Sequence, residues 1–230
     1  MVVATLLAAV VPLLSPGSLG PVPVGSVRVY LVRHGQAFSN LDPEPDLPAD
    51  QLDRLTKLGH EQSRAVGVAL RDRGVTLVLS SPAARAQETA AEIRVALDAP
   101  PVRVEPRLRP LQLGRDRNGK PFDWDQRIAE WEAGRDPAPA GGESMGQMGN
   151  RVLALVRSLL PAQSGRSVVL VAHSEVIGAF VGLVEGTPPP KRYPPRIRNG
   201  AMTAVELDAG GKPRLLFANH VPSEASPEAR

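Results

Sequence analysis

Apolar runs alternate with segments of helical apolar spacing along most of the chain. Runs rich in Val, Leu and other apolar residues predict strands at 27–32, 75–80, 102–104, 168–172, 202–207 and 214–217. The run at 168–172 contains no polar residue, which is typical of a central parallel strand that is covered on both faces. The pattern predicts a sheet with at least one fully buried strand.

Between these runs the apolar spacing predicts helices that begin at recognisable caps. Thr56 is expected to cap a helix that extends to about Arg73, before Gly74. Ser81, followed by Pro82, is expected to cap the next helix. Further helices are predicted at about 83–97, 125–133, 144–160 and 176–184. The alternation of strand and helix favours a three-layer α/β/α fold with a mostly parallel central sheet.

We expect one main domain over residues 26–221, with a tail at 222–230. Residues 106–142 are rich in Gly, Pro and charge, and we expect a cap insertion there. Trp124 and Trp131 lie seven positions apart in this insertion. Their spacing places both on one helix face, where they either pack the insertion onto the core or shape a substrate pocket.

Residues 1–25 form an apolar, Pro- and Gly-containing extension. The uncharged stretch 2–14 has the length of a signal-peptide core, but it lacks a basic start and a clear cleavage site. Three interpretations remain: a weak export signal, a loosely packed extension, and a translation start assigned too far upstream. The last two are favoured, so the expected location is cytoplasmic, with export as the alternative.

Composition excludes several classes of function. The chain has no cysteine, which excludes a disulfide scaffold, a thiolate zinc site and a cysteine nucleophile. The 27 basic and 24 acidic residues are mixed along the chain, and aromatics make up only 3% of it. A nucleic-acid-binding face would show a basic stripe with aromatics. We therefore expect neither a nucleic-acid nor a membrane partner, and the oligomeric state is left open.

Candidate chemistry gathers where three predicted strands end. Arg33 and His34 follow the first strand, Arg85 lies just after the second, and His173 follows the strand at 168–172. The carboxyl ends of parallel strands meet at one edge of a sheet, where ligands bind. Two guanidinium groups around a neutral imidazole suit phosphoryl transfer through a phosphohistidine. Such a site requires no metal and no other cofactor.

The same residues belong to a longer series of motifs that spans about residues 27–220. These are Arg33-His34-Gly35 with Asn40, Asp53-x-Leu55-Thr56-x-x-Gly59-x-x-Gln62, Ser80-Ser81-Pro82-x-x-Arg85-Ala86-x-x-Thr89-Ala90, Gly141-Gly142-Glu143-Ser144 and Val171-Ala172-His173. In this order they resemble the histidine phosphatase superfamily, in its phosphoglycerate-mutase-like branch. The resemblance implies that His34 is the residue phosphorylated. It also implies a phosphate pocket made with Arg33, Arg85 and His173, with Asn40 as an added ligand.

Two departures from the family pattern concern the proton donor. Family members usually carry a Glu as general acid in a Leu-x-Glu segment, and Pro110 stands in its place here. The family's His-Gly-Gly is here His173-Ser174-Glu175, which adds Ser174 to the candidate phosphate ligands. We hypothesise that Glu175 replaces the missing acid, as in a related branch with an acid just after the second histidine. The alternative is that Glu175 only stabilises a helix N-terminus.

Two acids in the insertion, Asp116 and Asp123, are weaker candidates for the proton donor. The favoured function is a metal-independent phosphomonoesterase acting on a small phosphorylated metabolite. A phosphoglycerate mutase-type phosphotransferase and a non-catalytic phospho-ligand binding protein are the alternatives. A metallohydrolase with His34, His173 and Glu175 as ligands is a further one.

Overall fold

The computed structural model describes residues 14–98, 101–192 and 197–222. They form one six-stranded sheet with strand order β3-β2-β4-β1-β5-β6. The strands are β1 (Val27–Arg33), β2 (Val75–Ser80), β3 (Arg103–Val104), β4 (Arg166–Ala172), β5 (Met202–Leu207) and β6 (Pro213–His220). Neighbours from β3 to β1 pair in parallel, whereas β5 pairs antiparallel with both β1 and β6.

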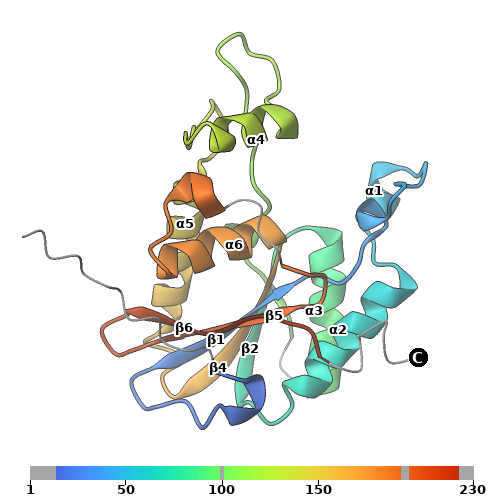
Figure 1. The fold of residues 1–230 in the computed structure, drawn as a ribbon. Helices are drawn as coiled ribbons and strands as arrows, with labels where there is room; N and C mark the ends of the chain where they lie inside the picture. The colour runs from blue at the N-terminus through green and yellow to red at the C-terminus, as the bar shows by residue number, and fades with distance from the viewer. Residues whose placement is uncertain (1–13, 99–100, 193–196, 223–230) are drawn as a thin grey trace, which may run out of the picture.

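Helices cover both faces of the sheet, which confirms the predicted three-layer α/β fold (Figure 1). One face carries α2 (Lys57–Ala69) and α3 (Ala84–Leu97), and the other carries α5 (Met145–Leu159) and α6 (Ser174–Val184). Side chains alternate between the layers along each strand. In β1, Val29 and Leu31 join the α5–α6 side of the core, while Tyr30 and Val32 join the α2–α3 side. Burial on both faces explains the uninterrupted apolar run in β4.

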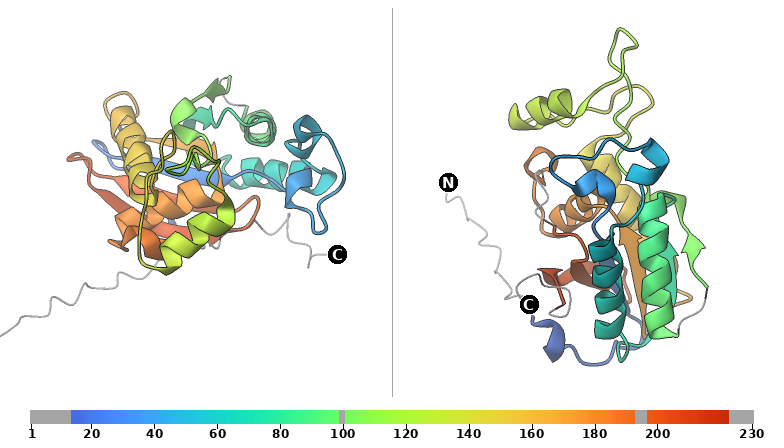
Figure 2. Two further views of the ribbon diagram at one scale, coloured as in Figure 1. Left: turned by 90° about the horizontal axis from the view of Figure 1, so that it is seen from above. Right: turned by 90° about the vertical axis from the view of Figure 1, so that its right-hand side faces the viewer.

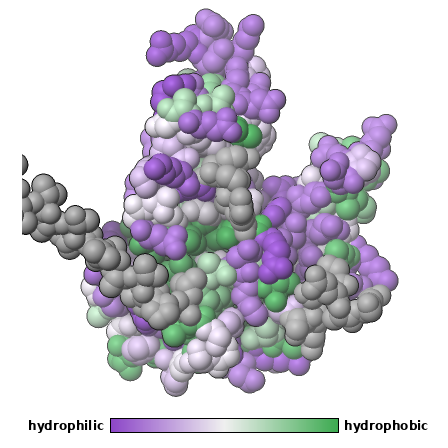
Figure 3. Space-filling view, viewed as in Figure 1, coloured by the Kyte–Doolittle hydropathy of each residue, from purple (hydrophilic) through white to green (hydrophobic). Residues whose placement is uncertain are grey.

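Two segments project beyond these layers. The insertion at 106–142 begins with η3 (Pro106–Leu108) and carries α4 (Trp124–Glu132) at its outer end, at the top of Figure 1 and of the right-hand view in Figure 2. The loop after β1 carries η2 (Phe38–Asn40) and α1 (Ala49–Leu52). Both projections are mainly hydrophilic, and the surface is notched between them (Figure 3).

The spacing of the two tryptophans of the insertion leaves open whether they pack on the core or shape a substrate pocket, and the structure places the two differently. Their ring centroids lie 6.4 Å apart, as expected for neighbours on one face of α4. Trp131 is only 4% exposed and belongs to the core cluster beneath α4, so it packs the insertion onto the core. Trp124 is 42% exposed at the start of the helix.

Most predicted element bounds hold within a few residues, and the capping box of α5 (Ser144 with Gln147) is present. The expected cap of α3 is wrong. The N-cap residue is Ala83, whose side chain has no hydrogen-bonding atom, and the Ser81 hydroxyl lies 2.8 Å from a ring nitrogen of His173. The helix after Thr56 also ends at Ala69, several residues before the predicted Arg73.

Residues 14–25 of the extension, which include η1 (Pro16–Ser18), contact the domain. The backbone N–H of Leu14 donates to Leu216 in β6 at 2.7 Å. Residues 1–13 and 223–230 lie outside the described residues, so the interpretations of the apolar stretch stay predictions. None of the helices in the described ranges combines the length and the apolar character that a membrane span needs.

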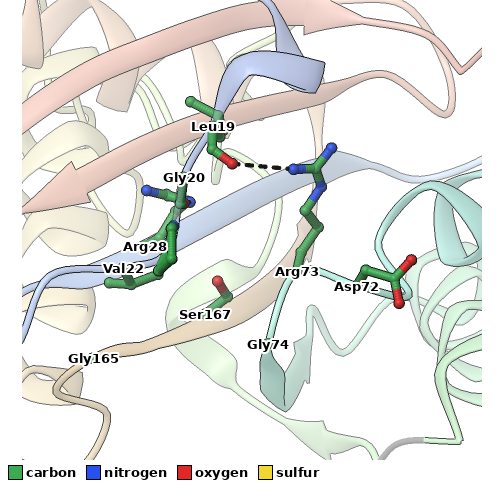
Figure 4. Close-up of a pocket in the computed structure, with 10 residues that line it drawn as sticks. Leu19, Gly20, Val22, Arg28, Asp72, Arg73, Gly74, Gly165 and Ser167 are labelled. Atoms are coloured by element: carbon green, nitrogen blue, oxygen red, sulfur yellow. Dashed lines mark hydrogen bonds between the residues drawn. The ribbon is translucent and has the colours of Figure 1, made fainter.

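A cavity of about 360 Å³ lies where the extension crosses the amino ends of β1 and β4 (Figure 4). Arg28 and Ser167, at the start of these strands, line it, and Arg73 closes one side by donating to the carbonyl of Leu19. The strands are about 20 Å long at 3.3 Å per residue, which separates this cavity from the residues at their carboxyl ends. It is therefore a feature of the opposite edge of the sheet.

The buried centre of β4 generates a stability prediction. We expect Leu170→Ala to lower the free energy of unfolding by about 3 kcal/mol, because it leaves a cavity in a fully buried strand. Val95→Ala on the outer face of α3, where Val95 is 69% exposed, should change it by less than about 0.5 kcal/mol. Urea denaturation measures both. Equal losses in the two variants would contradict the assigned core.

Candidate active site

The pairing of β1 with β4 brings the two candidate histidines together. In this parallel pair Arg33 lies opposite Ala172, so His34 and His173 follow at neighbouring strand ends. The backbone N–H of His34 donates to the carbonyl of Ala172 at 3.0 Å, which fixes the two ends against each other. The imidazole centroids are 5.2 Å apart, and both residues are at most 3% exposed.

The surroundings of His34 leave its Nε2 atom as the nucleophilic nitrogen. Nδ1 lies 2.8 Å from the carbonyl oxygen of Gly35, which only accepts hydrogen bonds, so Nδ1 carries the proton. Burial, followed by the positive charges of Arg85 and then Arg33, lowers the pKa of His34 to about 3. The ring is therefore neutral around pH 7, with a lone pair on Nε2.

Arg85 connects the two histidines. Its Nε donates to Nε2 of His34 at 3.1 Å, and its Nη2 lies 3.1 Å from Nδ1 of His173. Asp53 holds the remaining side of the guanidinium through an ion pair with Nη1, and its other oxygen accepts from the backbone N–H of Ala84 at 2.8 Å. Asp53 thus orients both Arg85 and the start of α3.

His173 is neutral for the same physical reasons as His34. Burial, then the neighbouring His34, Arg85, Arg33 and Arg151, holds its pKa well below the usual value. Its Nε2 lies 2.8 Å from the hydroxyl of Ser81, on the side away from Arg85. Both histidines thus turn one ring nitrogen toward the same guanidinium.

Arg33 adds a second cation with an available donor. One of its terminal nitrogens donates to the carbonyl of Ile197 at 2.7 Å, whereas its buried Nε has no hydrogen-bond partner among the described residues. Burial lowers the pKa of Arg33, and the charge of Glu175 opposes this shift, so the two side chains lie near each other. A buried unpaired N–H is costly, and a phosphate oxygen would satisfy it.

Asn40 is oriented by a residue that the sequence reasoning missed. Its Oδ1 accepts from the backbone of Ala37 at 3.1 Å and from Nδ2 of Asn199 at 2.9 Å, which leaves its own amide N–H groups on the opposite side. Asn199 also donates to the carbonyls of His34 and Gly35, at 3.1 and 3.3 Å. Asn199 belongs to none of the motifs above, although it stands three residues before the predicted strand at 202–207.

Two glycines of the motifs allow close backbone approach. A Cβ atom at Gly35 would lie 2.3 Å from the carbonyl oxygen of Gly59, and one at Gly59 would lie 2.1 Å from that of Gln36. Only glycine fits at either position. The start of α2 is thereby pressed against the loop that carries His34.

Glu175 and Ser174 lie in the first turn of α6, which begins directly after His173. The Ser174 hydroxyl donates to Oε2 of Glu175 at 3.2 Å. Glu175 is half-buried and close enough to Arg33 to affect its pKa. The carboxyl group therefore belongs to the same cluster of side chains as Arg33.

The other acidic candidates are occupied elsewhere. Asp123 caps α4, and Asp116 accepts backbone N–H groups within its own turn. Glu143 is buried, and both its oxygens accept from Arg151, at 2.6 and 3.0 Å. Arg151 also donates to the carbonyl of Arg109, next to Pro110. The segment of Pro110 is thus tied to Arg151, and its ionisable side chain, Arg109, is a cation that pairs with Glu143.

Comparison with known proteins agrees with this geometry. Residues 29–220 match the family model described as histidine phosphatase superfamily (branch 1). The chain belongs to the histidine phosphatase superfamily. Its matches include a "Probable phosphoglycerate mutase GpmB" of Yersinia pestis, 32% identical over 193 residues, which cover 78% of this chain and 85% of the relative. The phosphoglycerate-mutase-like branch predicted from the motifs is thereby confirmed.

Solved structures give the same fold. A mycobacterial glucosyl-3-phosphoglycerate phosphatase in complex with VO3 is 28% identical, with a TM-score of 0.64 over 84% of this chain and 98% of that one. Bacillus stearothermophilus YhfR is 25% identical, with a TM-score of 0.68 over 87% of this chain and 100% of that one. A phosphoserine phosphatase of Entamoeba histolytica, 19% identical, has a TM-score of 0.69 over 87% of this chain and 100% of that one, and supports the fold alone.

The positions of the His34 and His173 ring nitrogens test the alternative that these residues bind a metal in a metallohydrolase. A metal bound by His34 and His173 would need their free nitrogens to face a common cation, and the Arg85 guanidinium occupies that position. Within the described ranges, no group of three His, Cys, Asp or Glu residues is arranged to hold a metal ion. In the described residues, the ring nitrogens of His34 and His173 thus face the cationic guanidinium of Arg85.

The lowered pKa of His34 generates a prediction for stability against pH. The pKa is about 3 in the folded chain and 6.5 in the unfolded one, so only the unfolded chain gains this proton as the pH falls from 6.5 toward 3. Folding stability is therefore lost with falling pH. Between about pH 7 and pH 5 we expect wild type to lose about 2 kcal/mol more than His34→Gln. Urea titrations of both proteins measure this, and parallel pH dependences would contradict it.

Proposed function

We propose that the protein is a metal-independent phosphomonoesterase that acts on a small phosphorylated metabolite through a phosphohistidine at His34. The observation that carries this proposal is the neutral, buried His34, whose Nε2 faces Arg85 while its Nδ1–H is held by Gly35. Membership of the superfamily and the phosphatases among the structural neighbours support it.

In the proposed reaction, Nε2 of His34 attacks the phosphorus atom as the bond to the ester oxygen breaks. Arg33 and Arg85 stabilise the charge on the phosphoryl oxygens, and His173 and the amide of Asn40 donate to them. The Arg85 hydrogen bond to His34 is exchanged for bonds to the phosphoryl group. Water then attacks the phosphohistidine and releases phosphate. Ser174, at the N-terminus of α6, is proposed as a further phosphate ligand.

Glu175 is proposed as the group that protonates the departing alcohol and later accepts a proton from the attacking water. Pro110 cannot do either, and Glu143, Asp116 and Asp123 are held by other partners. The position of Glu175 close to His173, and its proximity to Arg33, support this role. In the alternative, Glu175 only neutralises Arg33 and stabilises the start of α6. The leaving-group experiment below distinguishes this alternative from the role of proton donor.

The phosphatase activity is tested with a panel of phosphomonoesters in the presence of excess chelator. We expect wild type to release phosphate and to form an acid-labile phosphoprotein, and His34→Ala to do neither, because the nucleophile is lost. His60→Ala is the matched control, since His60 pairs with Glu92 outside the site. A wild type that binds vanadate but releases no phosphate from any ester would indicate the binding-protein alternative, and loss of activity in chelator would indicate a metallohydrolase.

The role of Glu175 is tested by comparing a good and a poor leaving group. We expect Glu175→Gln to lower kcat/KM for an alkyl phosphate by roughly 100-fold, and for p-nitrophenyl phosphate by less than about 10-fold, since kcat/KM reports the step in which the alcohol leaves and nitrophenolate leaves without a proton. Glu185→Gln, at the exposed far end of α6, serves as the control. If both substrates slow equally, or neither slows, Glu175 is not the proton donor.

A mutase-type phosphotransferase is the second candidate, because the Yersinia relatives carry that name. It would transfer the phosphoryl group between positions of phosphoglycerate without net release of phosphate. Net phosphate release in the panel above therefore distinguishes the two.

A further inference from the structure

The two histidines differ in the partner behind each ring. Nδ1 of His34 faces the Gly35 carbonyl, whereas Nε2 of His173 faces the Ser81 hydroxyl, each at 2.8 Å. A carbonyl oxygen can only accept a hydrogen bond, but a hydroxyl can both donate and accept. The partner of His34 thus fixes one tautomer, and the partner of His173 is compatible with either.

In the site as observed, Arg85 determines which tautomer His173 adopts. Its Nη2 lies 3.1 Å from Nδ1 of His173, and a guanidinium can only donate. Nδ1 must therefore carry the lone pair. The proton of the neutral ring lies on Nε2, and the Ser81 hydroxyl accepts it.

A bound phosphoryl group reverses this requirement, because its oxygens accept hydrogen bonds and offer no donor. A neutral His173 can donate a hydrogen bond from Nδ1 to such an oxygen only if the ring proton has moved to Nδ1. Its Nε2 is then an acceptor inside a fully buried environment and needs a donor there. The hydroxyl of Ser81 supplies one by rotating its O–H bond toward the ring.

We propose that Ser81 is a positioning residue that lets His173 exchange between an Nε2–H tautomer in the empty site and an Nδ1–H tautomer in the phosphoryl-bound site. The inference rests on the proposed function, which places a phosphoryl oxygen next to His173. In the exchange, Nδ1 gains one proton from water and Nε2 returns one to water. The charge and the proton count of the ring stay the same.

The local structure holds Ser81 for this contact. Ser81 is fully buried, and its backbone N–H donates to the Val171 carbonyl at 2.9 Å, which ties the end of β2 to β4. Its hydroxyl does not cap α3, although it accepts a 3.3 Å hydrogen bond from the N–H of Ala83. The adjacent Ser80 is equally buried, but its hydroxyl donates to the Ser81 carbonyl and makes no contact with His173 among the described residues.

The first test reads the tautomer directly in wild type. Long-range ¹H–¹⁵N spectra of protein labelled at histidine, assigned with His173→Gln, report which ring nitrogen is protonated. We expect His173 to be protonated at Nε2 in the free protein and at Nδ1 with saturating vanadate, while His34 keeps its Nδ1 proton in the free protein. A His173 that keeps Nε2–H with vanadate, or carries both protons, would overturn the proposal.

The second test uses variants at adjacent buried serines. Ser81→Ala should lower kcat and vanadate affinity by roughly 10-fold each, because one hydrogen bond of His173 is lost in the bound state. Ser81→Thr, which keeps the hydroxyl, should restore most of both, and Ser80→Ala should behave as wild type. A Ser81→Ala protein with wild-type kcat and vanadate affinity would contradict the role of Ser81.

These outcomes are separable from failure of the proposed function. A wild type that neither releases phosphate nor binds vanadate would refute the phosphatase proposal itself. An active wild type in which His173 does not change tautomer would refute only the inference about Ser81. Thermal unfolding of each variant shows that the fold is retained, and the wild-type spectra, once assigned, do not depend on how any Ser81 variant folds.

Discussion

The parallel pairing of β1 with β4 is the constraint on which the site depends. Its register places Arg33 opposite Ala172, so the next residue on each strand is a histidine at the same sheet edge. Shifting this register by one residue would turn the alternating core side chains of β4 to the wrong faces, because helices cover both sides. The apolar packing of the sheet therefore also fixes the distance between the two imidazoles. The spacing of the two histidines and the packing of the core therefore depend on the same register.

Much of this arrangement could be predicted from the sequence because it depends on local pattern. The apolar runs identify the strands, and the rule that parallel strand ends meet places His34, Arg85 and His173 at one edge of the sheet. The capping box of Ser144 was likewise local and correct. The placement of these residues in one cluster follows from periodicity and topology alone. Periodicity and topology do not predict which nitrogen of each ring faces Arg85, because this depends on side-chain rotamers that no pattern encodes.

The residues that the sequence reasoning missed or misread act across long separations. Asn199 reaches the loop of His34 from more than 160 positions away, and Asp53 holds Arg85 from across the next strand. Ser81 was expected to cap α3, since serine before proline favours that role. The same hydroxyl also contacts His173, 92 positions away, and the N-cap position itself is taken by Ala83. The contact with His173 is buried, where an unpaired imidazole nitrogen is costly, and the carboxylate of Asp53 accepts from the N–H of Ala84 at the start of α3.

Under the proposed mechanism, the phosphate pocket and the proton donor can vary independently. The pocket requires several groups at fixed positions around one phosphoryl group, so it depends on the register of the sheet and on Arg85. In the proposed mechanism a proton donor needs only to reach the leaving oxygen, so its role is not tied to one chain segment. Pro110 and Glu175 lie on two different segments, one next to a carbonyl that accepts from Arg151 and the other at the start of α6. Exchanging the acid from the first segment to the second leaves Arg33, Arg85 and both histidines in place. Under the proposed mechanism, such an exchange would alter which alcohols leave readily while the chemistry at His34 stays the same.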